Sequence, residues 1–323
     1  MTPLLDIQNL SVDFATRDGT VHALENVSFQ LARGETMGLV GESGSGKSVS
    51  AYAVMRLLGG SARVRADRMI SGGVDLLTAT DAEVAALRGK RMTMIFQNAR
   101  SALNPIRPIG QQIADVLRVH RAMPRRAAKQ AAIAALAEVR IPDPERRYHA
   151  YPFELSGGMC QRVMIALAFA SEPELLIADE PTTGLDVTTQ AVIMDLIREK
   201  SSQRRMSTIL ITHDLTLAAE YCDRFAVMHA GHVVEQGTTA DIFERAAHPY
   251  TGLLMKATPH GASNLSDLAA IPGSLPDLRR DLPPCRFVHR CAHSAPACAA
   301  ALPRVPLHPS HEVSCHMPWK VSA

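Results

Sequence analysis

The stretch Gly41-Glu-Ser-Gly-Ser-Gly-Lys47-Ser48 decides the fold class of this chain. It matches the phosphate-binding loop pattern GxxxxGK[ST], and it lies between a predicted strand, Glu35–Val40, and a predicted helix from Lys47 to about Leu58. Glycines let the backbone curl until several N–H groups point at one anion, and the helix N-terminus adds partial positive charge. A chance glycine-rich turn is the alternative, which the strand–loop–helix order disfavours. The predicted phosphate site comprises Gly41, Ser43, Gly44, Ser45, Gly46, Lys47 and Ser48, with Lys47 on the β- and γ-phosphates and Ser48 on Mg²⁺.

A second feature, a pair of acidic residues, also indicates the binding of a phosphate and Mg²⁺. The predicted strand Leu175–Ala178 runs directly into Asp179 and Glu180. Two adjacent carboxylates at a strand end are costly to bury unless a cation is present. Alone they could mark an exposed strand end. With the phosphate loop they predict that Asp179 holds Mg²⁺, directly or through water, and that Glu180 polarises a water for attack on the γ-phosphate.

Apolar periodicity around these motifs alternates between strands and helices. Such alternation predicts an α/β fold with a mostly parallel sheet covered on both faces. The predicted strands beyond those above are Leu4–Val12, Ala23–Leu31, Met92–Phe96, Ser207–Thr212 and Arg224–His229, and the predicted helices lie at residues 110–140 and Gln161–Ser171.

Composition excludes several classes of protein. Of 323 residues, 46% are apolar and 20% charged, which is typical of a globular chain and not of a disordered or collagen-like one. No apolar run approaches the roughly 18–20 residues of a bilayer span, and the N-terminus lacks a secretory signal pattern. A net charge of +2 and 4% aromatic residues do not suggest a nucleic-acid partner.

Four more motifs follow along the chain. They are Gln97 after the strand MTMIF, Leu155-Ser156-Gly157-Gly158-Met-Cys-Gln161-Arg162, Thr183-Gly-Leu-Asp186, and His213 after the strand STILIT. Singly, a Gln or His at a strand end is usually a satisfied polar residue, and Phe14 on the first predicted strand would alone be a core residue. In this order, the motifs resemble the Q-loop, signature, D-loop and switch histidine of the ATP-binding subunits of ABC transporters.

The resemblance implies a role for each residue. In the family, the signature serine and glycines bind the γ-phosphate of the nucleotide held by a second ATPase subunit, so two subunits meet head to tail around ATP. An aromatic residue stacks on adenine, and the switch histidine contacts the γ-phosphate. Carried over, the catalytic residues are Glu180 and His213, the nucleotide-binding residues beyond the loop are Phe14, Gln97, Ser156, Gly157, Gly158 and Asp186, and the Mg²⁺ ligands are Ser48, Gln97 and Asp179.

Two longer runs narrow the resemblance to the dipeptide/oligopeptide importer branch. They are residues 96–105, FQNARSALNP, and residues 151–166, YPFELSGGMCQRVMIA. Residues 248–254, HPYTGLL, resemble the start of that branch's C-terminal region. Nickel importers share the branch, so nickel is the alternative substrate. Cys160 departs from the usual polar or basic residue, but it lies outside Ser156-Gly157-Gly158 and is not expected to disable the site.

The implied organisation is an ABC ATPase domain at residues 1–250, with a parallel-sheet core, an antiparallel β-subdomain and a helical subdomain at about residues 98–172. A small irregular extension covers residues 251–323, where ten of the twenty prolines lie. The implied assembly is peripheral, on the cytoplasmic face of the inner membrane. It contains a related but different ATPase subunit, two transmembrane permease subunits and an extracytoplasmic solute-binding protein.

Two other functions remain open at this stage. A non-transport ABC ATPase of translation or DNA repair usually carries two ATPase domains or a long coiled coil, whereas this chain has one motif set and no heptad run. A binding-only module without hydrolysis is disfavoured by the presence of Glu180 and His213. ATPase activity measured with and without permeases would separate these readings.

The last 39 residues hold Cys285, Cys291, Cys298 and Cys315. Four thiolates in a proline-rich segment suit an iron–sulfur cluster or tetrahedral zinc, and metal binding can supply folding free energy. The spacing lacks the CxxC pairs of zinc ribbons, and residues 285–291, CRFVHRC, resemble the element that holds a [4Fe–4S] cluster in peptide-importer ATPases. We therefore expect ATP, Mg²⁺ and a structural [4Fe–4S] cluster. A zinc site that includes His289, His293, His311 or His316, and free thiols or disulfides, are the alternatives.

Overall fold

The computed structural model describes residues 2–258 and 270–319. The chain forms two compact units, Met1–Thr78 with Leu210–Ala323, and Ala79–Ile209. The boundary predicted near residue 250 rests on the distribution of proline and on the loss of apolar periodicity after it, and it stays a prediction.

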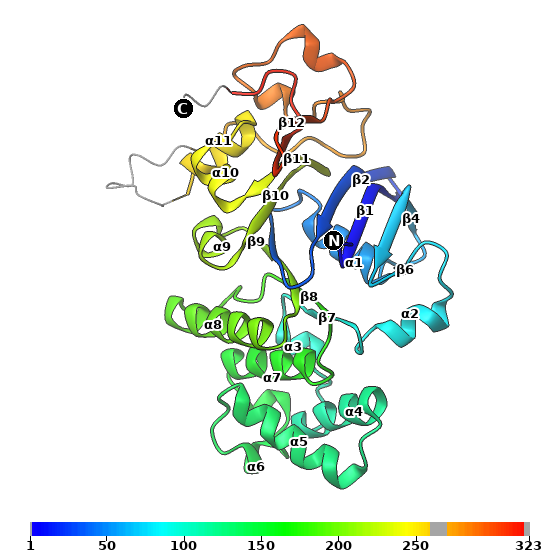
Figure 1. Cartoon of the computed structure of the whole chain (residues 1–323), viewed down its shortest axis with the longest axis vertical. Helices are drawn as coiled ribbons and strands as arrows, with labels where there is room; N and C mark the ends of the chain where they lie inside the picture. The colour runs from blue at the N-terminus through cyan, green and yellow to red at the C-terminus, as the bar shows by residue number, and fades with distance from the viewer. Residues whose placement is uncertain (1, 259–269, 320–323) are drawn as a thin grey trace. The chain divides into compact units, whose positions relative to one another are not determined.

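An antiparallel sheet occupies the first part of the first unit, with the strand order β2-β1-β5-β6 and β4 also paired with β1 (Figure 1). In β1 the buried apolar residues are Leu5, Ile7, Leu10 and Val12, so the apolar alternation shifts by one residue between Ile7 and Leu10. Asn9 lies at that shift with φ 53°. A β-bulge there keeps the apolar side chains on one face. The strands are β1 (Leu5–Thr16), β2 (Gly19–Leu31), β4 (Ala62–Arg65), β5 (Arg68–Ser71) and β6 (Val74–Asp75).

The same unit contains part of a second sheet, in the order β12-β13-β11-β10-β3. Strand β3 (Thr36–Val40) pairs in parallel with β10 (Arg224–His229), and β10 pairs antiparallel with β11 (His232–Thr238). Strands β3 and β10 are almost wholly buried, which explains their continuous apolar sequences. The helices of this unit are α1 (Lys47–Val54), α9 (Leu215–Tyr221), α10 (Thr239–Glu244) and α11 (Pro249–Lys256).

The second unit holds the parallel pair β7 (Met92–Ile95) and β8 (Leu175–Asp179), and strand β9 (Ser207–Thr212) spans the limit between the units. Its helices α4, α5 and α7 pack on one another, and α6 packs on α5 (Figure 1). This unit contains α2 (Asp81–Leu87), α3 (Ala99–Ala102), α4 (Ile109–Arg121), α5 (Arg125–Glu138), α6 (Pro144–Arg147), η1 (Pro152–Glu154), α7 (Gly157–Phe169) and α8 (Val187–Gln203). The predicted fold class, with parallel, antiparallel and helical parts, is confirmed.

Two predicted helix bounds differ from the structure. Helix α1 ends at Val54, four residues before Leu58, because Arg56 takes a left-handed conformation with φ 48°. Helix α7 begins at Gly157, four residues before Gln161, because Ser156 caps its N-terminus.

The C-terminal region is more ordered than its sequence indicates. Helix α11 runs across residue 250, and two short strands, β12 (Val305–His308) and β13 (His311–Val313), form a hairpin. Strand β13 pairs with β11 at Glu235↔Val313 and Gln236↔Glu312, so the hairpin extends the sheet. Strands of three or four residues are too short to show a period of two, which is why the sequence did not predict them. Among the described residues of this region, the one-turn helices η3 (Val288–Arg290) and η4 (Pro296–Ala299) are the other regular elements.

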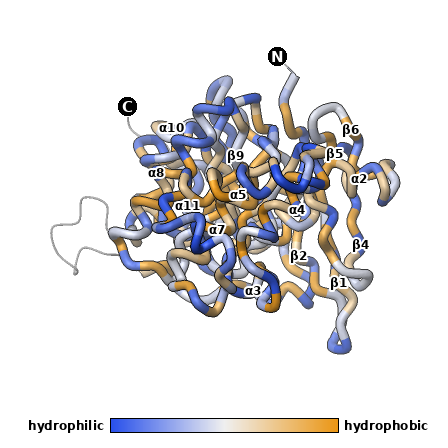
Figure 2. The backbone as a smooth tube through the Cα atoms, turned by 90° about the horizontal axis from the view of Figure 1, so that it is seen from below, coloured by the Kyte–Doolittle hydropathy of each residue, from blue (hydrophilic) through white to orange (hydrophobic). Residues whose placement is uncertain are grey.

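Within the described residues, no helix is both long and apolar enough to cross a bilayer. The hydropathy colouring in Figure 2 accordingly changes between polar and apolar over short stretches of chain.

Candidate functional site

The phosphate loop has the backbone that its glycines predict. Gly41 has φ 148° and Gly46 has φ 104°. A Cβ atom on Gly41 would lie well under 3.0 Å from the carbonyl oxygen of Met228, so glycine is required there for space as well as conformation. The buried Lys47 opens helix α1, and its Nζ donates to the carbonyl oxygens of Gly41 (2.7 Å) and Glu42 (2.9 Å). Lys47 is therefore held at the mouth of the loop, where a phosphate would bind.

Glu42, the second loop residue, is fixed by the C-terminal region. Its carboxylate accepts two hydrogen bonds from Arg290, at 2.7 and 2.9 Å, and its backbone N–H donates to the Tyr250 hydroxyl at 2.9 Å. The His229 ring, 3.7 Å away, and the Arg290 guanidinium together hold the pKa of Glu42 at about 2. Glu42 and Arg290 have no role predicted from the sequence. Because 248 positions separate them, no local pattern could have paired them.

Phe14 and His213 both lie in the first unit. Phe14 is half-buried in β1, opposite Val21 of β2 and Ala62 of β4. His213 is exposed directly after β9 and precedes Asp214, the N-cap of helix α9. Their predicted contacts with adenine and the γ-phosphate stay predictions.

In the second unit, the structure brings Gln97 and Glu180 together. Gln97 Nε2 donates to Glu180 Oε2 at 2.8 Å, and Thr183 Oγ1 donates to the same oxygen at 2.8 Å. Glu180 has φ 45°, and Asp179 before it is 2% exposed at the end of the buried strand β8. A strained backbone and two donors thus aim the Glu180 carboxylate, as a catalytic group requires.

The signature-like segment forms a capped helix start. Ser156 accepts a hydrogen bond from the N–H of Met159 at 3.3 Å, and Gly157 and Gly158 form the first turn of α7. Arg100, in α3 just after Gln97, donates to the carbonyl oxygen of Leu155 at 3.1 Å. Such a helix start can bind an anion, and Arg100 links it to the Gln97 loop.

Cys160 and Asp186 each have a structural partner. Cys160 is fully buried, and its Sγ lies 3.4 Å from the carbonyl oxygen of Pro152. Burial raises the pKa of this thiol, so it is an unreactive core group.

Asp186 caps helix α8 by accepting hydrogen bonds from Thr189 Oγ1 (2.7 Å) and Thr189 N (3.0 Å), and these bonds lower its pKa. Its predicted contact with nucleotide stays a prediction.

The four C-terminal cysteines surround one cavity. Cys285, Cys291, Cys298 and Cys315 all line it, and His248, Phe287, His293 and His316 are among the other lining residues. No disulfide joins any of the six cysteines, all of which lie in the described residues. Burial raises the pKa values of Cys285 and Cys291, and it raises that of Cys315 to about 11. A cation would be needed to keep these thiols ionised.

The spacing of the thiols bears on the two predicted occupants. Zinc bound by four sulfurs at about 2.3 Å requires sulfurs roughly 3.8 Å apart. In residues 2–258 and 270–319, no three of these sulfurs lie within 4.8 Å of one another. The described sulfur positions are therefore not those of a closed zinc tetrahedron. The N–H of Met317 donates to Cys315 Sγ at 3.3 Å, the kind of contact that tunes iron–sulfur clusters.

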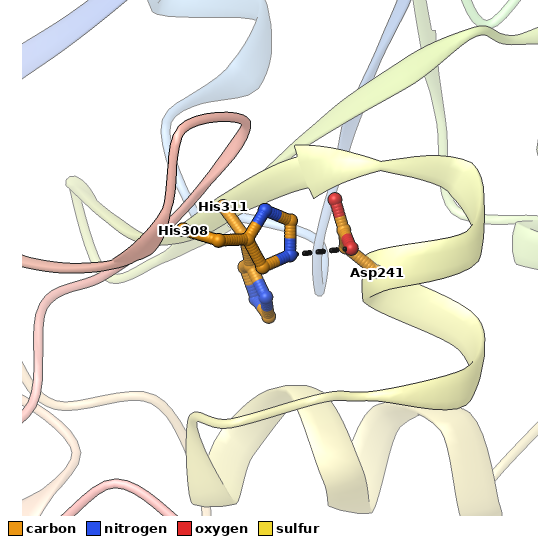
Figure 3. A group of neighbouring side chains, drawn as sticks. All are labelled: Asp241, His308 and His311. Atoms are coloured by element: carbon orange, nitrogen blue, oxygen red, sulfur yellow. Dashed lines mark hydrogen bonds and ion pairs between the residues drawn. The ribbon is translucent and has the colours of Figure 1, made fainter. Parts of the chain in front are cut away.

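Of the histidines named as alternative zinc ligands, His311 lies elsewhere. It is buried, and its Nε2 is 2.7 Å from Glu235 Oε1. Figure 3 shows His311 beside His308 and Asp241, where ligand atoms of all three lie within 4.8 Å. Asp241 is already satisfied, because it caps α10 through Thr238 and accepts from His308 at 2.9 Å. We interpret this cluster as a hydrogen-bond network in which His308 holds the β12–β13 hairpin to α10 and His311 holds it to β11.

Comparison with known proteins gives two family matches. Residues 24–183 match the model described as ABC transporter, and residues 234–298 match the C-terminal region of oligopeptide/dipeptide transporters. The chain is 48% identical to a probable D,D-dipeptide transport ATP-binding protein, DdpD, of Escherichia coli, over 92% of this chain and 90% of the relative. It is 45% identical to the dipeptide transport ATP-binding protein DppD of Haemophilus influenzae, over 98% of this chain and 96% of the relative.

Solved structures agree with these matches. The ATP-binding cassette MJ0796, in a dimeric post-hydrolysis state with ADP and Pi, has a TM-score of 0.64 and 25% identity, over 73% of this chain and 98% of that one. The cbiO1 protein of Clostridium perfringens, part of the ABC transporter complex cbiONQ, has a TM-score of 0.61 and 27% identity, over 76% of this chain and 92% of that one. This chain belongs to the ABC transporter family of ATPases, in the group that carries the oligopeptide/dipeptide transporter C-terminal region.

Proposed function

We propose that this chain is the ATP-hydrolysing subunit of an importer of dipeptides and oligopeptides. The observation that carries the proposal is a full set of ATPase motifs joined to a C-terminal region of the oligopeptide/dipeptide type. Relatives named for dipeptide transport are 44% to 48% identical over at least 92% of the chain. Nickel is the alternative substrate, and the experiment below tests it.

The proposed chemistry is phosphoryl transfer to water. Lys47 and Ser48 bind the phosphates and Mg²⁺, Asp179 is the second anchor for Mg²⁺, and Glu180 orients or deprotonates the attacking water. His213 then contacts the γ-phosphate. In such reactions, catalysis comes mostly from positioning and charge stabilisation. Gln97 supports this assignment, since it donates to the Glu180 carboxylate and would respond to movement of its own loop.

The proposed partners are two permease subunits, a second and related ATPase, and an extracytoplasmic solute-binding protein. Exposed apolar side chains support a permease contact, because Ile106 is 82% exposed and Phe153 is 73% exposed in the predicted helical subdomain at about 98–172. Val187, 81% exposed beside Asp186, supports a contact with the other ATPase. A partner that covered these side chains would remove their apolar surface from water, and this would favour binding. The complex would lie peripherally on the cytoplasmic face of the inner membrane.

We also propose that Cys285, Cys291, Cys298 and Cys315 hold a [4Fe–4S] cluster. The convergence of the four thiols on one cavity supports this assignment, and their sequence spacing lacks the CxxC pairs of zinc ribbons. The cluster would order a segment with little regular structure, and ATP-driven transport requires no redox step from it.

Reconstitution in liposomes tests this function. The chain, its partner ATPase and the two permeases are assembled, and ATP hydrolysis is measured with the loaded solute-binding protein. We expect stimulation by dipeptide and none by Ni²⁺. Stimulation by Ni²⁺ alone would assign the chain to nickel import, and hydrolysis unaffected by any permease would favour a non-transport ATPase.

A further inference from the structure

The cysteine cavity and the phosphate loop are joined by a polar contact. Arg290 directly precedes Cys291, and its guanidinium donates a hydrogen bond to each oxygen of the Glu42 carboxylate. The Arg290 side chain is 5% exposed, and its Nε also donates to the carbonyl oxygen of Pro272 at 2.7 Å. A guanidinium with this many fixed bonds has one position, so any movement of its backbone is transmitted to Glu42.

An aromatic contact joins the same two places. Phe287 forms part of the cavity wall and lies with its ring centroid 5.4 Å from that of Tyr250. The Tyr250 hydroxyl receives the backbone N–H of Glu42. Tyr250 and Phe287 are both almost fully buried, at 0% and 1% exposed. Close-packed rings of this kind move together, because the interior has no space to absorb a shift.

The backbone between the first two cysteines forms one tight unit. The N–H of Val288 donates to the carbonyl oxygen of Cys285 at 3.1 Å, and the N–H of Cys291 donates to that of Val288 at 3.3 Å. Helix η3 (Val288–Arg290) thus lies between the two cysteines with Arg290 inside it. Whatever fixes Cys285 and Cys291 also fixes the base of the Arg290 side chain.

From these contacts we propose that Arg290 is a positioning residue for the phosphate loop, and that the state of the four-cysteine cavity sets nucleotide affinity through Arg290 and Glu42. The inference rests on the proposed ATP site and goes beyond it. Coupling between two sites is reciprocal, so bound MgATP must in turn protect the cysteines. A residue that merely contributes to folding would not produce this protection.

The test uses the full chain and two readouts. The first is the equilibrium dissociation constant of a fluorescent ATP analogue with Mg²⁺, for wild type, Arg290→Ala, Glu42→Gln and the double variant. We expect each single variant to weaken binding by about tenfold, within the range of site-to-site coupling. The double variant should be no weaker than the singles, because both remove the same contact. Arg280→Ala is the matched control, since Arg280 is 80% exposed and pairs with Asp277 in the same region.

The second readout is the rate of alkylation of each thiol by iodoacetamide, measured by mass spectrometry. Saturating MgATP should slow modification of Cys285 and Cys291 by about fivefold or more in wild type and leave it unchanged in Arg290→Ala. A small free thiol added to the same mixture is the reference for the activity of the reagent. Thiolates bound to a metal react slowly with iodoacetamide, so rates with and without MgATP are compared within one preparation whose iron and zinc contents have been measured.

The outcomes separate the two proposals. Suppose that the wild-type chain binds MgATP tightly. If Arg290→Ala then binds MgATP equally well, or if MgATP does not slow alkylation of the wild-type thiols, the coupling is overturned and the ATPase function stays in place. Failure of wild type to bind MgATP overturns both. Purified protein without iron removes the cluster from the proposed function, and slower alkylation with MgATP would still support the coupling.

Discussion

Replacing Gly41 with alanine should displace the phosphate loop, and a second glycine provides the matched control. Gly41 is buried with φ 148°, and an added Cβ would lie well under 3.0 Å from the backbone oxygen of Met228. Gly73 also has a positive φ, 87°, but an added Cβ there would have nothing within 4 Å. Both glycines are in the first unit. Both substitutions therefore place an alanine in a backbone with positive φ, and only Gly41→Ala also brings a Cβ atom against the carbonyl oxygen of Met228.

The size of each effect follows from this difference. A left-handed-type conformation costs an ordinary residue roughly 1–2 kcal/mol, and this cost applies to Gly41→Ala and Gly73→Ala alike. The clash with Met228 adds an overpacking cost of about 1–3 kcal/mol, because a backbone carbonyl cannot rotate away as a flexible side chain can. We expect Gly41→Ala to lower the free energy of unfolding by about 2–5 kcal/mol, against about 1–2 kcal/mol for Gly73→Ala.

The single tryptophan makes this measurement specific to the first unit. Trp319 packs on Gly252, whose added Cβ would fall within 3.0 Å of the indole ring, and lies 5.5 Å from His293 between ring centroids. Urea unfolding followed by Trp319 fluorescence therefore reports this unit, and about 2 kcal/mol corresponds to a midpoint shift of roughly 1 M. MgATP binding should weaken by roughly tenfold or more in Gly41→Ala and stay unchanged in Gly73→Ala. Equal midpoints and equal affinities for the two variants would refute the described geometry of the loop.

Four further outcomes are expected. Glu180→Gln should lower phosphate release by about 100-fold or more while MgATP binding persists, because the amide keeps the shape and loses the base; near-normal turnover would remove Glu180 from its role. Cys291→Ser should abolish iron and sulfide content and disorder the extension more than it slows hydrolysis, whereas stoichiometric zinc in wild type would contradict the cluster. Ile106→Asp should abolish copurification with the permeases and leave the ATPase activity of the isolated subunit intact, since Ile106 is 82% exposed. The pKa of Asp241 is lowered to about 2, so its stabilising contribution is present above pH 4 and lost as the pH falls towards 2, and the penalty of Asp241→Asn in Trp319-monitored unfolding should shrink over that range.

Local chemistry explains what the sequence could predict. The phosphate loop, the acidic end of β8 and the helix start at Ser156 each depend on a few adjacent residues, so their patterns survive in the sequence. The strands before the phosphate loop and before Glu180 are buried on both faces, so each could be predicted from a short run of apolar residues in the sequence. The convergence of four cysteines on one cavity agrees with the clustering of those residues in the last 39 positions.

Long-range contacts explain what the sequence could not. The pairing of Glu42 with Arg290 joins positions 248 residues apart, and neither residue type is unusual where it stands. The N-cap role of Asp186 was missed because the D-loop resemblance offered another role for the same carboxylate. The hairpin of β12 and β13 depends on pairing with β11, and its strands are too short to show an alternating apolar pattern in the sequence.

The place of the C-terminal hairpin at the end of the β12-β13-β11-β10-β3 series has a consequence for solubility. A long strand with unpaired N–H and C=O groups invites another chain to add to it. Here β13 covers β11, and the outermost strand β12 has four residues and contains Pro306, which has no N–H to donate. A chain truncated before residue 300 would uncover the seven-residue strand β11, and we expect it to aggregate through that edge even where its ATP motifs remain intact.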